Sequence, residues 1–335
     1  MAEKFLYFLG AGASAQALPI VKKKTEWRDS LPNCMEIIAK EIRTNTQGYA
    51  HIDSDFFNGI ANNLEWLASE SRKYTTIDTY AKFLHLNDRE KLRTLKTTLS
   101  TYFFIEQIWY QRVDPRYLVW LTSVLSYPPE FPDNIKILTW NYDSQMQLTA
   151  EKFRKESIIF KGAATTHRPP LIRYFPNIGW SGSLNVTPEE TSLFHLNGMA
   201  GFYYSKKYNR YLHTQLDLVD HKDLELIKDF IENTYDVPLD FAWESVEDVL
   251  KLNFINKMIS DTTIMIVIGY SFPFFNRDID KKVFDILKSS GKLKKIYFQD
   301  PKLDGSFLKN QFDLEDSVII KHIEETDAFY IPFEM

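Results

Sequence analysis

The stretch FLYFLGAGAS, residues 5–14, decides the fold class predicted for this chain. Its apolar run followed by a Gly-Ala-Gly turn is the pattern of a buried strand that ends in a tight turn. Glycines at such a turn let another group approach the backbone closely, and that group is often a phosphate. A plain corner between a strand and a helix would carry the same letters, because one glycine-rich turn is a weak signal.

Later parts of the chain supply more strands of the same kind. The strand-like runs are NIKILTW (134–140), SLFHLNG (192–198), TTIMIVIGY (262–270) and KKIYFQD (294–300). Their successive apolar or β-branched residues are typical of parallel strands buried on both faces. Helical patterns lie between them in DSQMQLTAEKF (143–153) and RDIDKKVFDILKSSG (277–291), where Gly291 would cap the helix. The sequence therefore predicts a doubly wound α/β fold with a parallel sheet.

A chain of 335 residues is long enough for one large domain with insertions or for two domains. We predict one domain over 1–335, with its core in 1–31, 121–205 and 253–335 and a smaller insertion at 206–252. The remaining block, 32–120, has helical spacing and is predicted to be a helical insertion. Within it, TIDTYAKFL (76–84) offers Thr76 or Asp78 as a helix start. Because this block has no evident role in the chemistry, we expect it to provide a surface for an oligomer or a partner.

Composition narrows the class of protein. Apolar residues make up 44% of the chain and charged residues 25%, and no apolar run reaches the length of about 20 residues that spans a bilayer. We expect a cytoplasmic protein without membrane contact, because the charged start Met1–Lys4 leads straight into the first strand. A single cysteine, Cys34, excludes an internal disulfide and a cysteine-rich zinc site, and we expect no bound metal. The net charge of -5 gives no reason to predict direct nucleic-acid binding.

Small or polar residues follow every predicted strand. Ligands of open parallel sheets bind outside the carboxyl ends of the strands, so these residues are the candidate site. In chain order they are Gly10, Ala11, Gly12 and Ser14; Thr139, Asn141 and Asp143; His195, Asn197 and Gly198; Gly269 and Ser271; and Asp300. The first turn reads G-x-G-x-S rather than G-x-G-x-x-G, which argues against a simple hydride-transfer dehydrogenase.

Four of these motifs carry a family resemblance. GAGAS (10–14), TWNYD (139–143), FHLNG (194–198) and IGYSF (268–272) resemble the ordered motifs of the sirtuin-like NAD-binding fold, whose sheet is Rossmann-like. In particular, the chain resembles the bacterial sirtuin-like proteins of antiviral defence, which also tend to carry a helical insertion with a segment like IDTYAK (77–82). The two C-x-x-C pairs of sirtuin deacylases are absent, and ALPIVKKKTEW (17–27) replaces their G-I-P-D-F-R-type segment. The resemblance thus implies NAD+ hydrolysis rather than protein deacylation.

The resemblance gives the candidate residues their expected roles. Breaking the nicotinamide–ribose bond develops positive charge on the ribose, and the cationic leaving group needs little acid help. Asn141 would orient the ribose or the attacking water, and His195, unless it is a buried structural histidine, would act as the base. Asp143 would orient the loop, contact nicotinamide or stabilise the cation, or it would simply cap the next helix.

The rest of the candidate set is expected to bind the nucleotide. Backbone amides of Gly10, Ala11 and Gly12, with the helix start after them, would hold the pyrophosphate. Ser271 would lie near a phosphate or the adenine ribose, and Asp300 would accept from adenosine or serve as a turn residue before Pro301. Ser14, Thr139, Gly198 and Gly269 complete the expected binding residues.

By the same resemblance, the chain would be the effector of an anti-phage abortive-infection system. We expect it to act as a homo-oligomer or in an assembly with a partner such as an ATPase or a nucleic-acid-guided protein, and to stay inactive until triggered. The alternatives are a non-catalytic subunit that senses NAD+ or ADP-ribose, a protein deacylase and, least favoured, an oxidoreductase.

Overall fold

The computed structural model describes most of the chain. The described residues are 2–20, 25–46, 53–110, 112–156, 171–175, 187–205, 210–213, 228, 237, 239–244 and 248–335. Most of the insertion predicted at 206–252 lies outside these described residues.

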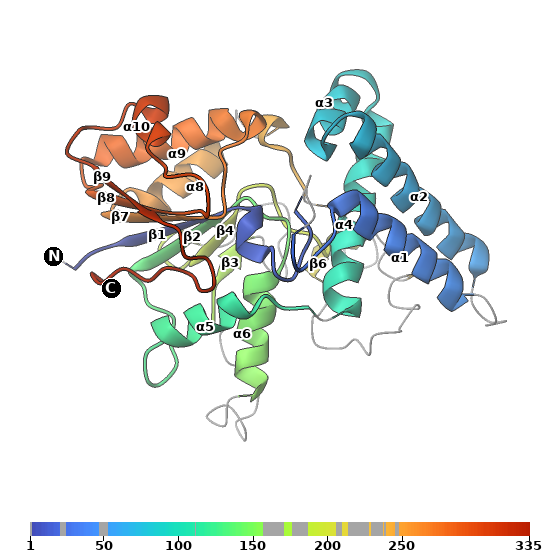
Figure 1. Ribbon diagram of the computed structural model, residues 1–335, viewed down its shortest axis with the longest axis horizontal. Coiled ribbons are helices and arrows are strands. Elements are labelled where there is room, and N and C mark those ends of the chain that lie inside the picture. Colours follow the sequence, from blue (N-terminus) through green and yellow to red (C-terminus); the bar gives the residue numbers. More distant parts are fainter. Residues whose placement is uncertain are drawn as a thin grey trace.

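A seven-stranded sheet with every strand parallel forms the centre of the molecule (Figure 1). Its strands are β1 (Phe5–Leu9), β2 (Ile135–Thr139), β3 (Tyr174–Phe175), β4 (Leu193–His195), β7 (Ile264–Ile268), β8 (Lys295–Gln299) and β9 (Ile319–Ile323). They lie in the order β3-β4-β2-β1-β7-β8-β9. Without β3, this is the 3-2-1-4-5-6 order of Rossmann-like sheets, so the α/β prediction is confirmed and a Rossmann-like fold is compatible with it. A separate antiparallel pair consists of β5 (Phe202–Ser205) and β6 (Arg210–His213).

Helices lie on both sides of this sheet in Figure 1. On one side are α5 (Pro115–Val124) and α6 (Gln145–Glu156), and on the other α8 (Val249–Ile259), α9 (Arg277–Ser290) and α10 (Phe307–Phe312). Strand β1 shows why five apolar residues in a row suit this position. Leu6 and Phe8 pack into the core shared with α8 and α9, whereas Phe5, Tyr7 and Leu9 pack into the core shared with α5. Alternate side chains point to opposite faces, so a strand buried on both faces is apolar throughout.

The helical block is built around a separate hydrophobic core, which also includes Ala200, Val237, Leu239 and Phe241 from later in the chain. It contains α1 (Leu31–Thr46), α2 (Ser54–Lys73), α3 (Ile77–Asn87) and α4 (Arg89–Trp109), and Figure 1 shows it beyond the carboxyl end of the sheet. Thr76, one of the two predicted helix starts, caps α3 by accepting a hydrogen bond from the N–H of Thr79. Helix α5 falls within the predicted insertion 32–120, yet its Trp120 packs against the sheet beside Tyr7.

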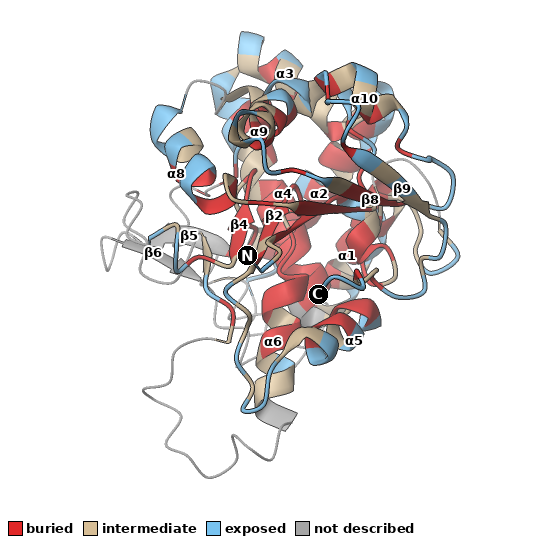
Figure 2. Ribbon diagram, turned by 90° about the vertical axis from the view of Figure 1, so that its left-hand side faces the viewer, coloured by how far each residue is buried: buried red, intermediate tan, exposed pale blue. Residues whose placement is uncertain are grey.

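Burial follows this division into layers: Figure 2 shows buried residues along the strands and on the inner sides of the helices. Short 3-10 helices are also found among the described residues, at η1 (Ala11–Ser14), η4 (Ala242–Glu244) and η5 (Phe274–Asn276). Among the described residues, no helix combines the length and the apolar character needed to cross a membrane.

Candidate active site at the carboxyl edge of the sheet

The turns after β1 and β7 interlock at the centre of the sheet. Gly10 N–H donates to the carbonyl of Ile268 at 3.0 Å, and Gly12 N–H donates to the carbonyl of Gly269 at 2.9 Å. A Cβ on Gly12 would lie 2.7 Å from the Cα of Gly269, which itself has a φ of +59°. The group that approaches these glycines closely is therefore the backbone of the neighbouring turn.

This interlock changes how the first turn would hold an anion. The amides of Gly10 and Gly12 already donate to protein carbonyls. Of the three residues expected to bind the pyrophosphate, only the exposed Ala11 has an amide that takes no part in this interlock. The predicted helix start after the turn is wrong: η1 has only four residues, and the next α-helix begins at Leu31. Such a short helix aligns few peptide dipoles, so it adds little to anion binding.

Asn141 is buried and fixed to the β1 turn. Its Nδ2 donates to the carbonyl of Gly10 at 3.0 Å and to Ser14 Oγ at 3.4 Å, and its backbone N–H donates to Thr139 Oγ1 at 3.1 Å. These contacts come from the ends of two adjacent strands, β1 and β2. The carboxamide is thus held in one orientation before any ligand arrives.

His195, the last residue of β4, meets Asn141 from the neighbouring strand. Its Nδ1 lies 3.0 Å from the carbonyl oxygen of Asn141. Because a carbonyl only accepts, Nδ1 carries the proton, and Nε2 is the acceptor for the side-chain amide of Gln147 at 2.8 Å. Burial lowers the pKa of His195 to about 4, although the hydrogen bond to Asn141 opposes the shift. The imidazole is therefore neutral at pH 7, with its lone pair on Nε2.

Asp143 lies at the start of α6. Its Oδ1 accepts from the N–H of Gln145, the first residue of the helix, at 3.1 Å. This contact fits the capping alternative, because a carboxylate at a helix start satisfies an unpaired amide. Burial raises the pKa of Asp143 to about 6, against the lowering effect of hydrogen bonds from Gln145 and Ser14. The side chain thus links the start of α6 to the β1 turn, near Asn141.

The remaining candidates lie at other strand ends. Gly198 has a φ of +73° and its N–H donates to the carbonyl of His195 at 3.3 Å, so it shapes the turn after β4. Ser271 is exposed after β7. Asp300, after β8, accepts at Oδ1 from the N–H groups of Lys302 and Leu303, both at 2.8 Å, which fits the turn alternative. Three strand spacings, about 14 Å, separate β8 from β2.

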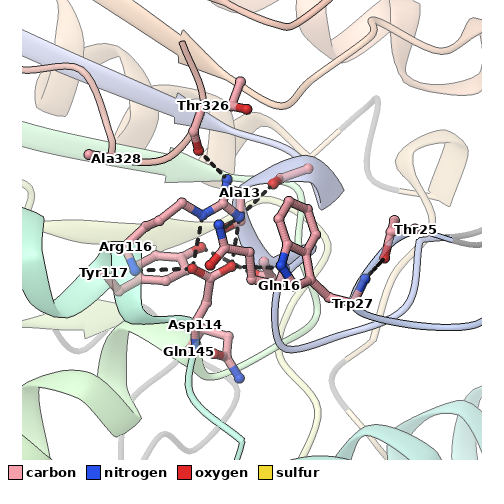
Figure 3. A network of polar contacts seen from close by, with 12 residues as sticks. Ala13, Gln16, Thr25, Trp27, Asp114, Arg116, Tyr117, Gln145, Thr326 and Ala328 are labelled. Atoms are coloured by element: carbon pink, nitrogen blue, oxygen red, sulfur yellow. Dashed lines mark hydrogen bonds and ion pairs between the residues drawn. The ribbon is translucent and has the colours of Figure 1, made fainter.

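A buried ion pair that the sequence analysis did not find holds the β1 turn from below (Figure 3). The guanidinium of Arg116 donates to the carboxylate of Asp114 at 2.6 and 2.9 Å and to the carbonyls of Gly12 and Ala13 at 3.0 and 3.1 Å. It also donates to the carbonyl of Thr326 in the C-terminal segment at 3.2 Å. No signal in the sequence marks this pair, since charged residues at a helix start are ordinarily exposed.

A buried aspartate, also missed, lies behind the site on α9. Asp280 accepts from Trp140 Nε1 at 3.0 Å and from the hydroxyl of Tyr270 at 2.8 Å. Trp140 precedes Asn141 and Tyr270 follows Gly269, so Asp280 joins the ends of β2 and β7. Burial raises the pKa of Asp280 to about 8. Its position offered a signal, because it lies on the same helix face as the apolar residues 283, 284 and 287.

Helix α4 reaches the loop that carries Asn141. Gln107 Oε1 accepts from the N–H of Ser144 at 2.7 Å, and the ring of Phe103 lies 6.1 Å from that of Tyr142. On the same helix, buried Glu106 pairs with Arg28 and Arg112, and burial raises its pKa to about 7. The helical block therefore adjoins the candidate site.

Comparisons with known proteins add no identification: no protein-family model matches the chain, and no curated protein matches it. Within the part of the chain that the structure describes, no three His, Cys, Asp or Glu side chains group as ligands for a metal ion.

Proposed function

We propose that this chain is an NAD+ hydrolase with a doubly wound, sirtuin-like fold, which cleaves the nicotinamide–ribose bond to give nicotinamide and ADP-ribose. The observation that carries the proposal is the direct contact between Asn141 and His195. Asn141 lies two residues after β2, and His195 ends the adjacent strand β4. Asn141 also contacts the β1 turn, and the strand order reverses between β1 and β7, where Rossmann-like sheets bind ligands.

The contacts around this pair support a division of tasks. Asn141 Nδ2 donates to Gly10 and Ser14, so its Oδ1 would accept a hydrogen bond from a ribose hydroxyl or the attacking water. His195 is neutral and carries a lone pair on Nε2, so it can accept a proton, although a pKa of about 4 makes it a weaker base than a histidine with its ordinary pKa. It would take the proton of the attacking oxygen while nicotinamide leaves with the electrons of the C–N bond. Asp143 would stabilise the developing charge from the start of α6.

The sheet order suggests where the nucleotide would lie. Nicotinamide and its ribose would lie over the ends of β2 and β4, and the pyrophosphate would cross the β1 turn at Ala11. Adenosine would reach Ser271 at the end of β7 and Asp300 at the end of β8, and β8 lies about 14 Å from β2. Of the three amides expected to bind the pyrophosphate, those of Gly10 and Gly12 donate to the β7 strand end and turn, so the proposal keeps Ala11 alone in this role.

By the resemblance to defence proteins, the proposed enzyme acts in the cytoplasm as an anti-phage effector. It would work as a homo-oligomer or with an ATPase or a nucleic-acid-guided partner, and α1–α4 would provide the assembly surface. The Gln147 amide donates a hydrogen bond to Nε2 of His195, the atom that would accept the proton, which favours a resting state in which the base is not yet available. The same observation supports a second candidate function, a subunit that binds NAD+ or ADP-ribose without cleaving it.

The test is NAD+ consumption with nicotinamide release by the purified protein, alone and in lysate from phage-infected cells. We expect His195→Ala and Asn141→Ala each to lower turnover at least about a hundredfold, the lower end of what a general base contributes. His85→Ala on α3 controls for the loss of a histidine.

Each other outcome has a distinct meaning. Turnover retained in both variants would refute the assigned roles. Calorimetric binding of NAD+ without nicotinamide release would favour the sensing subunit. Transfer of an acetyl group from an acetyl-lysine peptide to ADP-ribose would identify a deacylase.

A further inference from the structure

Gln147, on the first turns of α6, is buried against His195. Its Nε2 lies 2.8 Å from His195 Nε2 and 3.1 Å from the sulfur of Met199. Both contacts use the nitrogen end of the carboxamide. Its Oε1 is buried and has no hydrogen-bond partner among the residues that the structure describes.

A buried acceptor without a donor is costly, so this arrangement needs an explanation. A second one lies close in the chain: Asn197, two residues after His195, donates through Nδ2 to the hydroxyl of Tyr142 at 3.4 Å, while its Oδ1 is buried and unpartnered among the described residues. Both orphaned atoms are acceptors, so the group that would satisfy them is a donor. Hydroxyl groups of a sugar are donors of this kind.

A carboxamide can serve either protonation state of an imidazole. With Nε2 of the amide toward the ring, as here, it donates to a neutral histidine. Turned over, it presents Oε1 and accepts from a protonated one. A histidine that gains a proton during a reaction and later loses it needs both partners in turn.

We propose that Gln147 is a positioning residue for His195. It holds the Nδ1–H tautomer before the reaction and turns over to accept the Nε2 proton after His195 has taken that proton from an oxygen nucleophile. The electron pair stays on that oxygen, which bonds to the ribose carbon as nicotinamide leaves. Before transfer, the hydroxyl displaces the Gln147 amide from Nε2, and Asn197 Oδ1 accepts from a sugar hydroxyl. The proton transfer rests on the proposed hydrolase function, but the hydrogen bond by which Gln147 fixes the tautomer of His195 does not.

Two substitutions separate the two ends of the carboxamide. Gln147→Met keeps the length of the side chain and removes both donor and acceptor, whereas Gln147→Glu keeps only acceptors. Gln311→Met on α10 is the matched control, because it makes the same change away from His195. Nitrogen-15 NMR of labelled histidine reports the tautomer and the titration of His195 in the full chain, without substrate.

We expect Gln147→Glu to raise the pKa of His195 by about one pH unit or more, because a carboxylate favours the imidazolium. Gln147→Met abolishes the Nε2 hydrogen-bond shift, and it lowers kcat about ten- to a hundredfold with little change in KM. Gln311→Met changes none of these. If Gln147→Met leaves both the shifts and the titration of His195 as in the wild type, the positioning role is overturned, whether or not Gln147→Glu folds.

The same experiment separates the inference from the proposed function. If the NMR changes occur but wild-type protein never releases nicotinamide, the hold of Gln147 on His195 stands and the hydrolase proposal fails. If wild type is active and Gln147→Met keeps full kcat, the hydrolase stands and the catalytic part of this inference falls.

Discussion

Neutralising Asp280 should change how the stability of the protein depends on pH. The carboxyl group is buried, and its pKa is about 8 in the folded protein against 3.8 as the ordinary value. Between these values the folded state holds a proton that the unfolded state has lost. Raising the pH through this window therefore favours unfolding, and stability is greatest below it. The Asn side chain of Asp280→Asn ionises in neither state, so the variant does not lose stability in this way as the pH rises.

The size of the effect follows from the pKa difference. Each pH unit within the window corresponds to about 1.4 kcal/mol. The free energy of unfolding of Asp280→Asn relative to that of the wild type should therefore rise by about 3 kcal/mol between pH 5 and pH 7. Asn keeps an acceptor for Trp140, and its amide nitrogen takes the place of the OH that a protonated Asp280 carboxyl presents to the hydroxyl oxygen of Tyr270, which limits structural damage. Urea denaturation of both proteins at pH 5, 6, 7 and 8 measures the difference.

The control for this experiment is Asp278→Asn, which removes an exposed carboxylate from the same first turn of α9. We expect it to change stability by a few tenths of a kcal/mol, as a lost helix-dipole contact does. A difference between Asp280→Asn and wild type that is constant from pH 5 to pH 8 would show that Asp280 is ionised in the folded protein, and the reasoning would be refuted.

Three further outcomes are expected. Gly269→Ala should lower the free energy of unfolding, measured in urea, by at least about 2 kcal/mol, because the backbone at this residue is left-handed and the added Cβ would lie 2.5 Å from the β1 turn. The control Gly59→Ala, in open space on α2, should raise the free energy of unfolding by about 0.5–1 kcal/mol. Arg116→Met should cost about 3–5 kcal/mol in the same assay by leaving Asp114 buried without its partner, and a loss below 1 kcal/mol would contradict that account. If the proposed hydrolase is active, kcat/KM should fall in two steps as the pH drops, through about 6, where Asp143 becomes neutral, and through about 4, where His195 becomes charged. Asp143→Asn should keep only the lower step, and a midpoint near 6.5 in that variant would mean that the histidine is not buried as described.

The sheet was largely predictable because its inner strands are continuous apolar runs. Strand β9 was not, since Ile319–Ile323 is an edge strand with exposed and half-buried positions that include Lys321 and His322. Strand β3 has only two residues, too few to show any period. Edge strands carry mixed side chains because one side of their backbone has no neighbouring strand.

For the candidate site, sequence reasoning predicted the strand-end residues but not their helical partners. The rule that parallel strands end at one edge was enough to bring Asn141 and His195 together. Gln147 and Arg116 come from helices, and the rotation of a helix about its axis decides whether a polar side chain points to solvent or to the site. The sequence does not specify that rotation for polar residues as clearly as an apolar stripe does.

The position of β1 in the sheet has a consequence for biosynthesis. Its two neighbours pair with it at Ile135 and Ile264, so this strand leaves the ribosome well before either strand that flanks it in the sheet. Helices α1–α4 are built around a separate core and can begin to fold earlier. The apolar β1, in contrast, can pair with β2 only after residue 139 has been synthesised and with β7 only after residue 268, and such long sequence separation makes folding slow. During that interval a hydrophobic strand that has not yet paired with both neighbours can aggregate or bind chaperones. The yield of folded protein in a heterologous host should therefore depend on chaperone supply.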